Sequence, residues 1–228
     1  MINFATIVIG KMDTDEIRKH IEHYKSQDKK MFATTSLQTH SIVLLHILAG
    51  IDKTIPVYFI NTGYHFPETM KFREEVSQRL NVEIKILNST ISKHLQKDNR
   101  GNLLFTVDPD HCCYLNKIIP VDNILMSMDV WINGVRASQS ESRRALQMEE
   151  KAAHNTLRYH PLLRWTDKMI FDYIKEYNLP RHPLEEKGYI SIGCEPCTRK
   201  AFGNDERESR WYGLNKTECG LNTDLIEK

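Results

Sequence analysis

Apolar and polar positions along this chain form two kinds of segment, short uninterrupted apolar runs and longer amphipathic stretches. The apolar runs predict buried strands, which we expect at residues 31–36, 55–60, 82–87 and within 124–132. Residues 13–29 carry acidic side chains early and lysines late, with Ile17, Ile21 and Tyr24 on one stripe, and this pattern predicts a helix. Further helices are expected at 41–48, at 68–80 and from a Thr166 cap to residue 177.

Strands that alternate with helices predict an α/β fold with a doubly wound, mainly parallel sheet. From residue 185 onward the chain is rich in glycine, charge and cysteine, which indicates an irregular extension. We expect one domain over residues 1–228, with a core at about 13–180 and an appended segment at about 181–228.

The first loop after a predicted strand is TTSLQTHS, at residues 34–41. It is not a Walker loop, because it has neither glycines nor a terminal Lys-Ser/Thr pair. It does offer several hydroxyls and backbone N–H groups where a helix begins, which suits a phosphate. The same residue types also serve as simple helix caps, so this loop alone leaves both interpretations open.

Composition and charge narrow the function classes. The 228 residues carry a formal net charge of +1, which predicts neither a nucleic-acid partner nor a membrane partner. No segment approaches the roughly 20 apolar residues that span a bilayer. The first residues lack a basic leader with a cleavage site, and we expect a cytoplasmic, reducing location.

The five cysteines fall into three groups. Cys112 and Cys113 are adjacent, Cys194 and Cys197 form a CEPC pair, and Cys219 stands alone in ECGL. Two close pairs of thiols suit a zinc, iron–sulfur or redox site, whereas a lone thiol near glycine suits a nucleophile. Buried packing is the alternative for the lone thiol and for the adjacent pair.

Several segments together resemble the 3′-phosphoadenylyl/adenylyl-sulfate reductase family of the assimilatory sulfate pathway. TTSLQTHS resembles its pyrophosphate loop, and FINTGYHFPET its LDTG loop. WINGVRASQSESRR is similar to its arginine-bearing loop. PLLRWTDKMIFDYIKEYNLPRHPLEEKGYISIGCEPCTR is similar to its longest signature, and NDERESRW with ECGL to its arginine segment and catalytic tail. The resemblance runs from about residue 31 to residue 221.

The resemblance implies a fold of the adenine nucleotide alpha hydrolase-like (PP-loop) type and a specific use of the cysteines. Members with the CC…CxxC set resemble iron–sulfur enzymes that take adenosine 5′-phosphosulfate. Cys112, Cys113, Cys194 and Cys197 are then expected to hold a [4Fe–4S] cluster, with zinc as the competing metal. Cys219 is expected to form an S-sulfocysteine that thioredoxin or another external thiol donor, such as glutathione, resolves.

The resemblance also assigns a substrate-binding set. It comprises Ser36, Leu37, Gln38, Thr39, Thr62, Gly63, Lys117, Arg136, Arg207 and Arg210. His182 and Trp211 lie in matched segments as well, and we interpret them as packing or orienting groups.

Three positions depart from the family pattern, and all are expected to line the substrate cleft. Asn61 replaces the aspartate of LDTG, Leu37 stands where an aromatic residue is common, and Ala137 where a second basic residue often follows. These departures keep 3′-phosphoadenosine 5′-phosphosulfate open as the substrate. An ATP-dependent tRNA-thiolation enzyme and an iron–sulfur sensor are the remote alternatives, and homo-oligomerisation is left open.

Overall fold

The computed structural model describes residues 4–201, 209–214 and 216–225, with the backbone alone over residues 4–12. Its helices are α1 (Phe4–Ser26), α2 (Thr39–Ile51), α3 (Pro67–Leu80), α4 (Leu104–Val107), α5 (Pro109–Cys113), α6 (Ile119–Leu125), α7 (Glu141–Arg144) and α8 (Asp167–Glu176). Its strands are β1 (Met31–Thr35), β2 (Val57–Asn61), β3 (Ile84–Asn88), β4 (Val130–Asn133), β5 (Glu149–Lys151) and β6 (Leu157–Tyr159).

The described strands form one six-stranded sheet in the order β3-β2-β1-β4-β6-β5. Every neighbouring pair is parallel except β5 with β6, which is antiparallel. The chain winds outward from β1 in both directions, so the expected doubly wound, mainly parallel sheet is confirmed. Such a sheet brings the loops after β1, β2 and β4 to one edge, and ligands of these folds bind at that edge.

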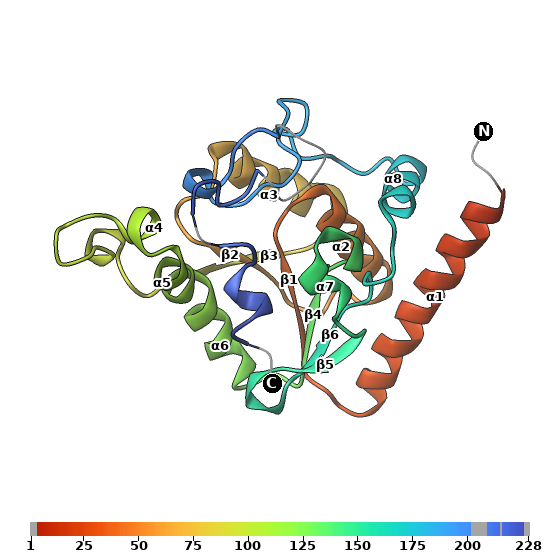
Figure 1. Cartoon of the computed structure of the whole chain (residues 1–228). Helices are drawn as coiled ribbons and strands as arrows, with labels where there is room; N and C mark the ends of the chain where they lie inside the picture. Colours follow the sequence, from red (N-terminus) through yellow and green to blue (C-terminus); the bar gives the residue numbers. More distant parts are fainter. Residues whose placement is uncertain (1–3, 202–208, 215, 226–228) are drawn as a thin grey trace.

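Helices cover both faces of the sheet (Figure 1). On one face α1, α2, α3 and α8 enclose the larger apolar core, to which the predicted stripe Ile17, Ile21 and Tyr24 contributes three buried side chains. On the other face α6 and the end of the chain bury a smaller core that includes Phe32, Trp131 and Leu225. The last described residues therefore lie against the sheet, with the Ala153 N–H donating to the Leu225 carbonyl at 3.1 Å.

Two predicted helices agree closely with the structure at their N-termini. Thr166 caps α8, since its side chain accepts a hydrogen bond from the Met169 N–H at 3.2 Å. Pro67 opens α3 at a position where a missing N–H costs nothing, and Asn81 closes it in the left-handed conformation. None of the described helices is both long and apolar enough to cross a membrane.

Three expectations about elements were wrong in detail. The first helix begins at Phe4 rather than at residue 13, because the apolar run before the acidic residues continues the same helix. The segment expected to contain the fourth strand is divided between α6 and β4. β5 and β6 were not predicted, because each has only three residues and charged side chains interrupt the apolar pattern.

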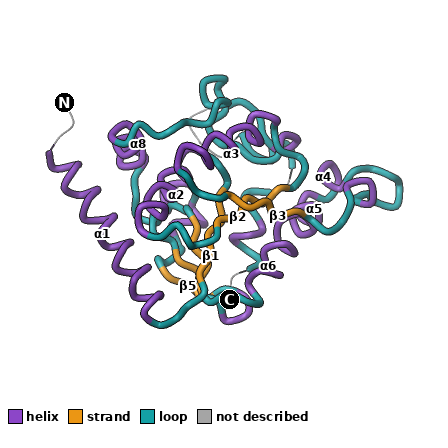
Figure 2. Tube along the Cα trace, turned by 180° about the vertical axis from the view of Figure 1, so that it is seen from behind, coloured by secondary structure: helices purple, strands orange, loops and turns teal. Residues whose placement is uncertain are grey.

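Two irregular segments complete the molecule. The stretch between β3 and α6 carries α4 and α5 and projects beyond the edge of the sheet (Figure 2). The stretch at 181–201 folds back over the carboxyl ends of the strands. There the Ile192 N–H donates to the Gln38 side chain at 3.1 Å, and the Glu195 N–H donates to the Tyr64 carbonyl at 2.7 Å. The extension expected from residue 185 is thus irregular in structure and attached to the core.

Candidate active site

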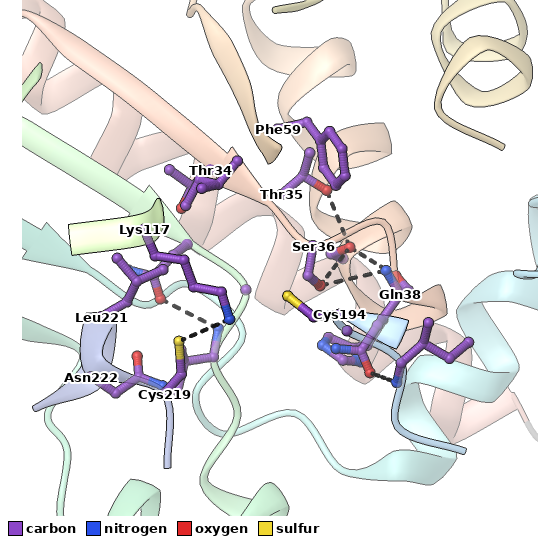
Figure 3. Close-up of a pocket in the computed structure, with 18 of the residues that line it drawn as sticks. Thr34, Thr35, Ser36, Gln38, Phe59, Lys117, Cys194, Cys219, Leu221 and Asn222 are labelled. Atoms are coloured by element: carbon purple, nitrogen blue, oxygen red, sulfur yellow. Dashed lines mark hydrogen bonds between the residues drawn. The ribbon is translucent and has the colours of Figure 1, made fainter. Parts of the chain in front are cut away.

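A cavity lies at the carboxyl ends of the central strands, where the extension and the end of the chain close over the sheet. Figure 3 shows its interior, with the Lys117 ammonium and the Cys219 thiol turned toward each other opposite the loop after β1. Of the described residues, four with cationic side chains line it, and they are Lys117, Arg143, Arg158 and Arg210. The polar lining from the strands and loops comprises Thr34, Thr35, Ser36, Gln38, His40, Ser41, His65 and Asn133. No aspartate or glutamate of the described residues lines this cavity, so it is suited to an anion.

The loop between β1 and α2 forms one wall of the cavity. Its hydroxyls hold its own backbone, since Thr35 Oγ1 accepts from the Leu37 N–H at 3.2 Å and Ser36 Oγ from the Gln38 N–H at 3.4 Å. Leu37 has a φ of 58° and a fully buried side chain, so the core anchors this strained turn. The N-cap of α2, Gln38, makes no side-chain capping bond, and the start of a helix is a favourable position for a phosphate.

Cys219 lies on the opposite side of the cavity, half-buried, in a turn that packs on the sheet. The Lys117 ammonium is 4.0 Å from its sulfur and comes from the π-helical turn Tyr114–Ile118. Burial raises the pKa of the Cys219 thiol, but Lys117, the backbone of Leu221 and Arg210 together lower it by more, so the pKa lies below the ordinary value. Cys219 is therefore disposed to act as a thiolate nucleophile.

Gly220 packs closely beside the nucleophile. A Cβ at Gly220 would lie 2.7 Å from the Ile118 side chain, so a larger residue would have to displace that side chain. Gly220 begins a short 3₁₀ turn, with its backbone outside the left-handed region. Its role in the closed structure is close approach to the turn that carries Lys117.

A buried ion pair ties the end of the chain to α7. Arg143 donates to both carboxylate oxygens of Glu218, through Nε at 2.9 Å and Nη2 at 2.8 Å. The same carboxylate accepts the backbone N–H of Cys219 at 2.8 Å and Asn222 Nδ2 at 3.1 Å. Because both charges are buried and bidentate, the pair fixes the backbone on each side of the nucleophile.

Arg210 occupies the roof of the cavity. Its Nε donates to the Cys197 carbonyl at 3.3 Å, and its guanidinium lies 4.6 Å from the centre of the Trp211 ring. A Cβ at Gly193 would meet the guanidinium at 2.3 Å, so a glycine is required for Arg210 to lie across that backbone. This cation is thus held in place over the cavity by the CEPC segment.

A second, smaller cavity adjoins the first and is lined by all four cysteines of the two predicted pairs, Cys112, Cys113, Cys194 and Cys197. Burial and the neighbouring thiols raise the pKa of Cys112 to about 12 and that of Cys197 to about 11. Within the described ranges, no three or more His, Cys, Asp or Glu side chains form a site that could hold a metal ion. The thiols therefore surround a space without converging on one point.

The two cavities are in contact through shared residues. Cys194 and Lys117 line both of them. Cys194 Sγ also lies 3.1 Å from the hydroxyl of Thr62, which belongs to the loop after β2. A charge placed among the four cysteines would consequently be felt at the Lys117 ammonium.

The structure brings together five residues of the predicted site at the main cavity. These are Ser36, Gln38, Lys117, Arg210 and Cys219. Arg207 lies outside the described residues.

Five other residues of the predicted substrate-binding set lie away from that cavity. Leu37 points into the core, and Thr39 contacts Glu185 and the His182 N–H. Thr62 lines the cysteine cavity, and Gly63 lies beside the Lys93 side chain. Arg136 is buried against Asp167 and Ser138. Their assignment to the substrate stays a prediction.

Two arginines of the cavity were missed. Arg143 is part of WINGVRASQSESRR, so the motif contained it, but only Arg136 was assigned from that segment. Arg158 lies on β6, a strand that the pattern did not predict. The signal that could have indicated Arg158 was its position between two apolar residues, Leu157 and Tyr159.

The family model described as phosphoadenosine phosphosulfate reductase domain matches residues 30–200. A Halalkalibacterium halodurans protein named adenosine 5′-phosphosulfate reductase is 35% identical over 223 residues, which cover 96% of either chain. A Chelativorans protein of the same name is 37% identical over 194 residues, covering 85% of this chain and 79% of that one.

Solved structures resemble the fold at lower identity. The phosphoadenylyl-sulfate reductase of Candida auris, solved as a phosphate complex, has a TM-score of 0.66 at 21% identity and covers 78% of this chain and 87% of its own. The FMN adenylyltransferase of Candida glabrata, with FMN and an ATP analogue, has a TM-score of 0.60 at 14% identity over 98% of this chain and 76% of its own. At these identities the structures establish a shared fold alone.

Proposed function

The chain belongs to the phosphoadenosine phosphosulfate reductase family, and we propose that it reduces adenosine 5′-phosphosulfate to sulfite and AMP at the cavity that contains Cys219. The family resemblance drawn from the motifs is confirmed by this membership. The observation that carries the proposal is the Lys117–Cys219 contact of 4.0 Å inside a cavity lined by the loop after β1. This contact supports the proposal, because the sulfate end of a nucleotide bound at that loop would reach the Cys219 thiolate.

In the first half of the reaction, the Cys219 thiolate attacks the sulfur of the bound sulfonucleotide. An S–S bond forms as the bond between sulfur and the bridging oxygen breaks, and AMP leaves with the electron pair of that bond. The enzyme then carries the sulfo group on Cys219 as an S-sulfocysteine. Lys117 and Arg210 neutralise the anionic groups that approach the thiolate, so attack is not opposed by charge repulsion.

In the second half, an external thiolate attacks the Cys219 sulfur. The S–S bond to the sulfo group breaks, sulfite leaves with its electron pair, and a mixed disulfide remains on Cys219. A second thiol of the donor then resolves that disulfide, so two thiols supply the two electrons. We propose a thioredoxin-type dithiol as the donor, because the other cysteines of the chain line the second cavity.

We propose further that Cys112, Cys113, Cys194 and Cys197 hold a [4Fe–4S] cluster. The donor set fits, because four thiolates suit iron and the four thiols surround one cavity. A cluster binds each thiolate at a different iron, so its ligands stand around a space, whereas zinc draws four ligands to one point. When bound, such a cluster would supply charge beside Lys117.

A cysteine substitution tests the proposed reaction. With adenosine 5′-phosphosulfate and thioredoxin, Cys219→Ser should form no sulfite, and intact-mass measurement should find no protein-bound sulfo group. The variant should keep the brown colour expected of the proposed cluster. Sulfite formation by this variant at the wild-type rate would contradict the role of Cys219. The ratio of kcat/KM for the two phosphosulfates then decides which nucleotide is preferred.

Metal analysis tests the proposed cluster. Anaerobically purified protein should contain about four iron atoms and four acid-labile sulfides per chain, the stoichiometry of the proposed cluster. Cys113→Ser is expected to lose most of both. One zinc per chain and no sulfide would show that the thiols hold the competing metal instead.

A further inference from the structure

Arg158 is a buried cation whose hydrogen-bonding capacity is largely unused. Its residue is 1% exposed, and it lines the main cavity from β6. Nη2 donates to the side-chain oxygen of Asn222, a neutral acceptor. Nε and Nη1 have no hydrogen-bond partner among the described residues. A guanidinium with two buried donors unpaired is costly unless a ligand completes it.

The orientation of this guanidinium is fixed by a row of side chains across the sheet. Phe32, Trp131 and Arg158 occupy paired positions on β1, β4 and β6. The Phe32 and Trp131 rings stack at 6.2 Å, and the guanidinium of Arg158 lies 4.4 Å from the Trp131 ring centre. Trp131 is held in turn by a 2.8 Å hydrogen bond from Nε1 to Thr34 Oγ1. Arg158 is therefore preorganised by packing.

The acidic groups around Arg158 do not hydrogen-bond to it. Glu150 is paired with Arg158 across β5 and β6, where one of its oxygens accepts from the Gln147 N–H and the other, 3.5 Å from His160, has no hydrogen-bond partner among the described residues. Glu218, on the tail, is bound bidentately by Arg143 of α7. Burial lowers the pKa of Arg158 to about 10, so the side chain remains charged near neutral pH. Among the described residues, Glu150 and Glu218 thus act on the charged Arg158 only through their electric field, and its Nε and Nη1 have no directly bound anion.

We propose that Arg158 is a substrate-binding residue that contacts the terminal sulfo group of the sulfonucleotide, a proposal that rests on the function proposed above. The sulfo end is favoured over the 3′-position of the ribose because Asn222, which holds Arg158, is three residues from Cys219. The sulfur atom must lie against Cys219 to react, so an anion near Cys219 is the terminal one. Asn222 accepts one N–H of Nη2, and the N–H groups of Nε and Nη1 remain for an oxyanion.

Nucleotide binding tests this assignment without turnover. ADP stands in for the sulfonucleotide, since its terminal phosphate replaces the sulfo group, and AMP lacks that group. Wild-type protein should bind ADP more tightly than AMP in calorimetry. Arg158→Met should weaken ADP binding by about ten- to hundredfold, the value of a charge-assisted contact, and leave AMP binding nearly unchanged. Arg158→Lys, which keeps the charge but not the fork, should be intermediate.

Control measurements separate the competing explanations. Arg73→Met removes an arginine on α3 that donates to the Ile84 carbonyl and does not line the cavity, so the preference for ADP should persist. Adenosine 3′,5′-bisphosphate reports on the 3′-phosphate. A loss confined to that nucleotide in Arg158→Met would overturn the assignment to the sulfo group.

Two further outcomes complete the test. If Arg158→Met does not fold, Arg158→Lys carries the comparison, and an unchanged ratio of ADP to AMP affinity in a folded variant would overturn the proposal. If wild-type protein binds neither ADP nor adenosine 5′-phosphosulfate, the proposed function itself fails and the role of Arg158 fails with it. If wild type forms sulfite while the Arg158 variants keep the ADP preference, the inference about Arg158 alone is wrong.

Discussion

At the scale of residues, burial raises the pKa of Cys219, and two neighbours of opposite charge adjust it further. The Lys117 ammonium favours the thiolate, whereas the Glu218 carboxylate, adjacent in the chain, disfavours it. Lys117 is 4.0 Å away and has the larger effect, while Glu218 is partly neutralised by Arg143. The ammonium therefore has the greater influence on the Cys219 pKa, and a single substitution of either neighbour can raise or lower that pKa.

We expect Lys117→Met and Glu218→Gln to change the pH dependence of Cys219 alkylation in opposite directions. Removing the ammonium raises the thiol pKa, so the alkylation profile moves to higher pH and the rate at pH 7 falls about tenfold or more. Removing the carboxylate lowers the pKa and moves the profile to lower pH. The measurement is iodoacetamide labelling of the Cys219 peptide by mass spectrometry, with exposed Lys71→Met as the control. Shifts of the same sign would contradict this account.

The residues of the site were predicted unequally well. Cysteine is rare and chemically distinctive, so the grouping of the five thiols was visible in the sequence, and the structure brings four of them to one cavity. Arginine is common, and its role depends on what lies across the sheet. Arg158 becomes a cavity residue only because β6 pairs with β4, a contact between segments far apart in the chain. Arg136 lies in the matched motif WINGVRASQSESRR, but it pairs with Asp167 on α8 and lies outside the cavity.

At the scale of elements, α7 and the tail act together through the Arg143–Glu218 pair. Four-residue α7 is held by Ser140, which caps it by accepting the Arg143 N–H at 3.3 Å. Residues Gly220 to Asn222 form a short 3₁₀ turn against the π-helical turn that carries Lys117. The position of the nucleophile thus depends on a contact between two elements that could not be stable alone.

We expect Arg143→Met to loosen the tail. It leaves Glu218 buried without its charge partner, which costs about 3 kcal/mol or more when the tail is docked. Amide hydrogen exchange at residues 218–225 should therefore become faster, and exchange in α8 should not change. In the double variant with Glu218→Gln the loss should be smaller than the sum of the single losses. Unchanged exchange in the tail of Arg143→Met would show that the pair does not hold it.

The elements themselves were predictable to the extent that they carry their own pattern. α8 was recovered almost to the residue because Thr166 provides a capping signal in the sequence. β6 was not recovered, because three residues contain too little periodicity and its stability comes from pairing with β4 and β5. Where the local sequence preference was weak, pairing with neighbouring strands determined the secondary structure.

At the scale of the whole molecule, His182 joins the extension to the core. Its Nδ1 accepts the Leu184 N–H at 3.2 Å, so the neutral ring carries its proton on Nε2 and donates to Thr69 of α3 at 3.0 Å. Burial lowers the pKa of His182 to about 4. The folded state therefore holds this imidazole neutral over a pH range in which the unfolded chain protonates it.

We expect the free energy of unfolding to fall as the pH is lowered from about 6.5 toward 4. The unfolded state binds the proton below its pKa of about 6.5, whereas the folded state binds it only near 4, so acid favours unfolding. The contribution of one group is about 1.4 kcal/mol per pH unit. Urea unfolding at several pH values gives the slope of the unfolding free energy against pH. This slope should be smaller for His182→Gln than for wild type. The control His23→Gln, at an exposed histidine, should keep the wild-type slope. Equal slopes in all three proteins would exclude the role of His182.

The row of side chains from Phe32 through Trp131 to Arg158 has an optical consequence. Of the three tryptophans, Trp131 and Trp211 line the cavity, and Trp165 lies in the larger core. Indole emission responds to charge placed beside the ring, and the two cavity tryptophans each have an arginine over the ring face. An anion bound to either guanidinium would change the charge beside its indole and therefore the intrinsic fluorescence. The molecule thus contains its own unlabelled reporter of occupancy, and a stopped-flow trace could time nucleotide arrival separately from sulfite release.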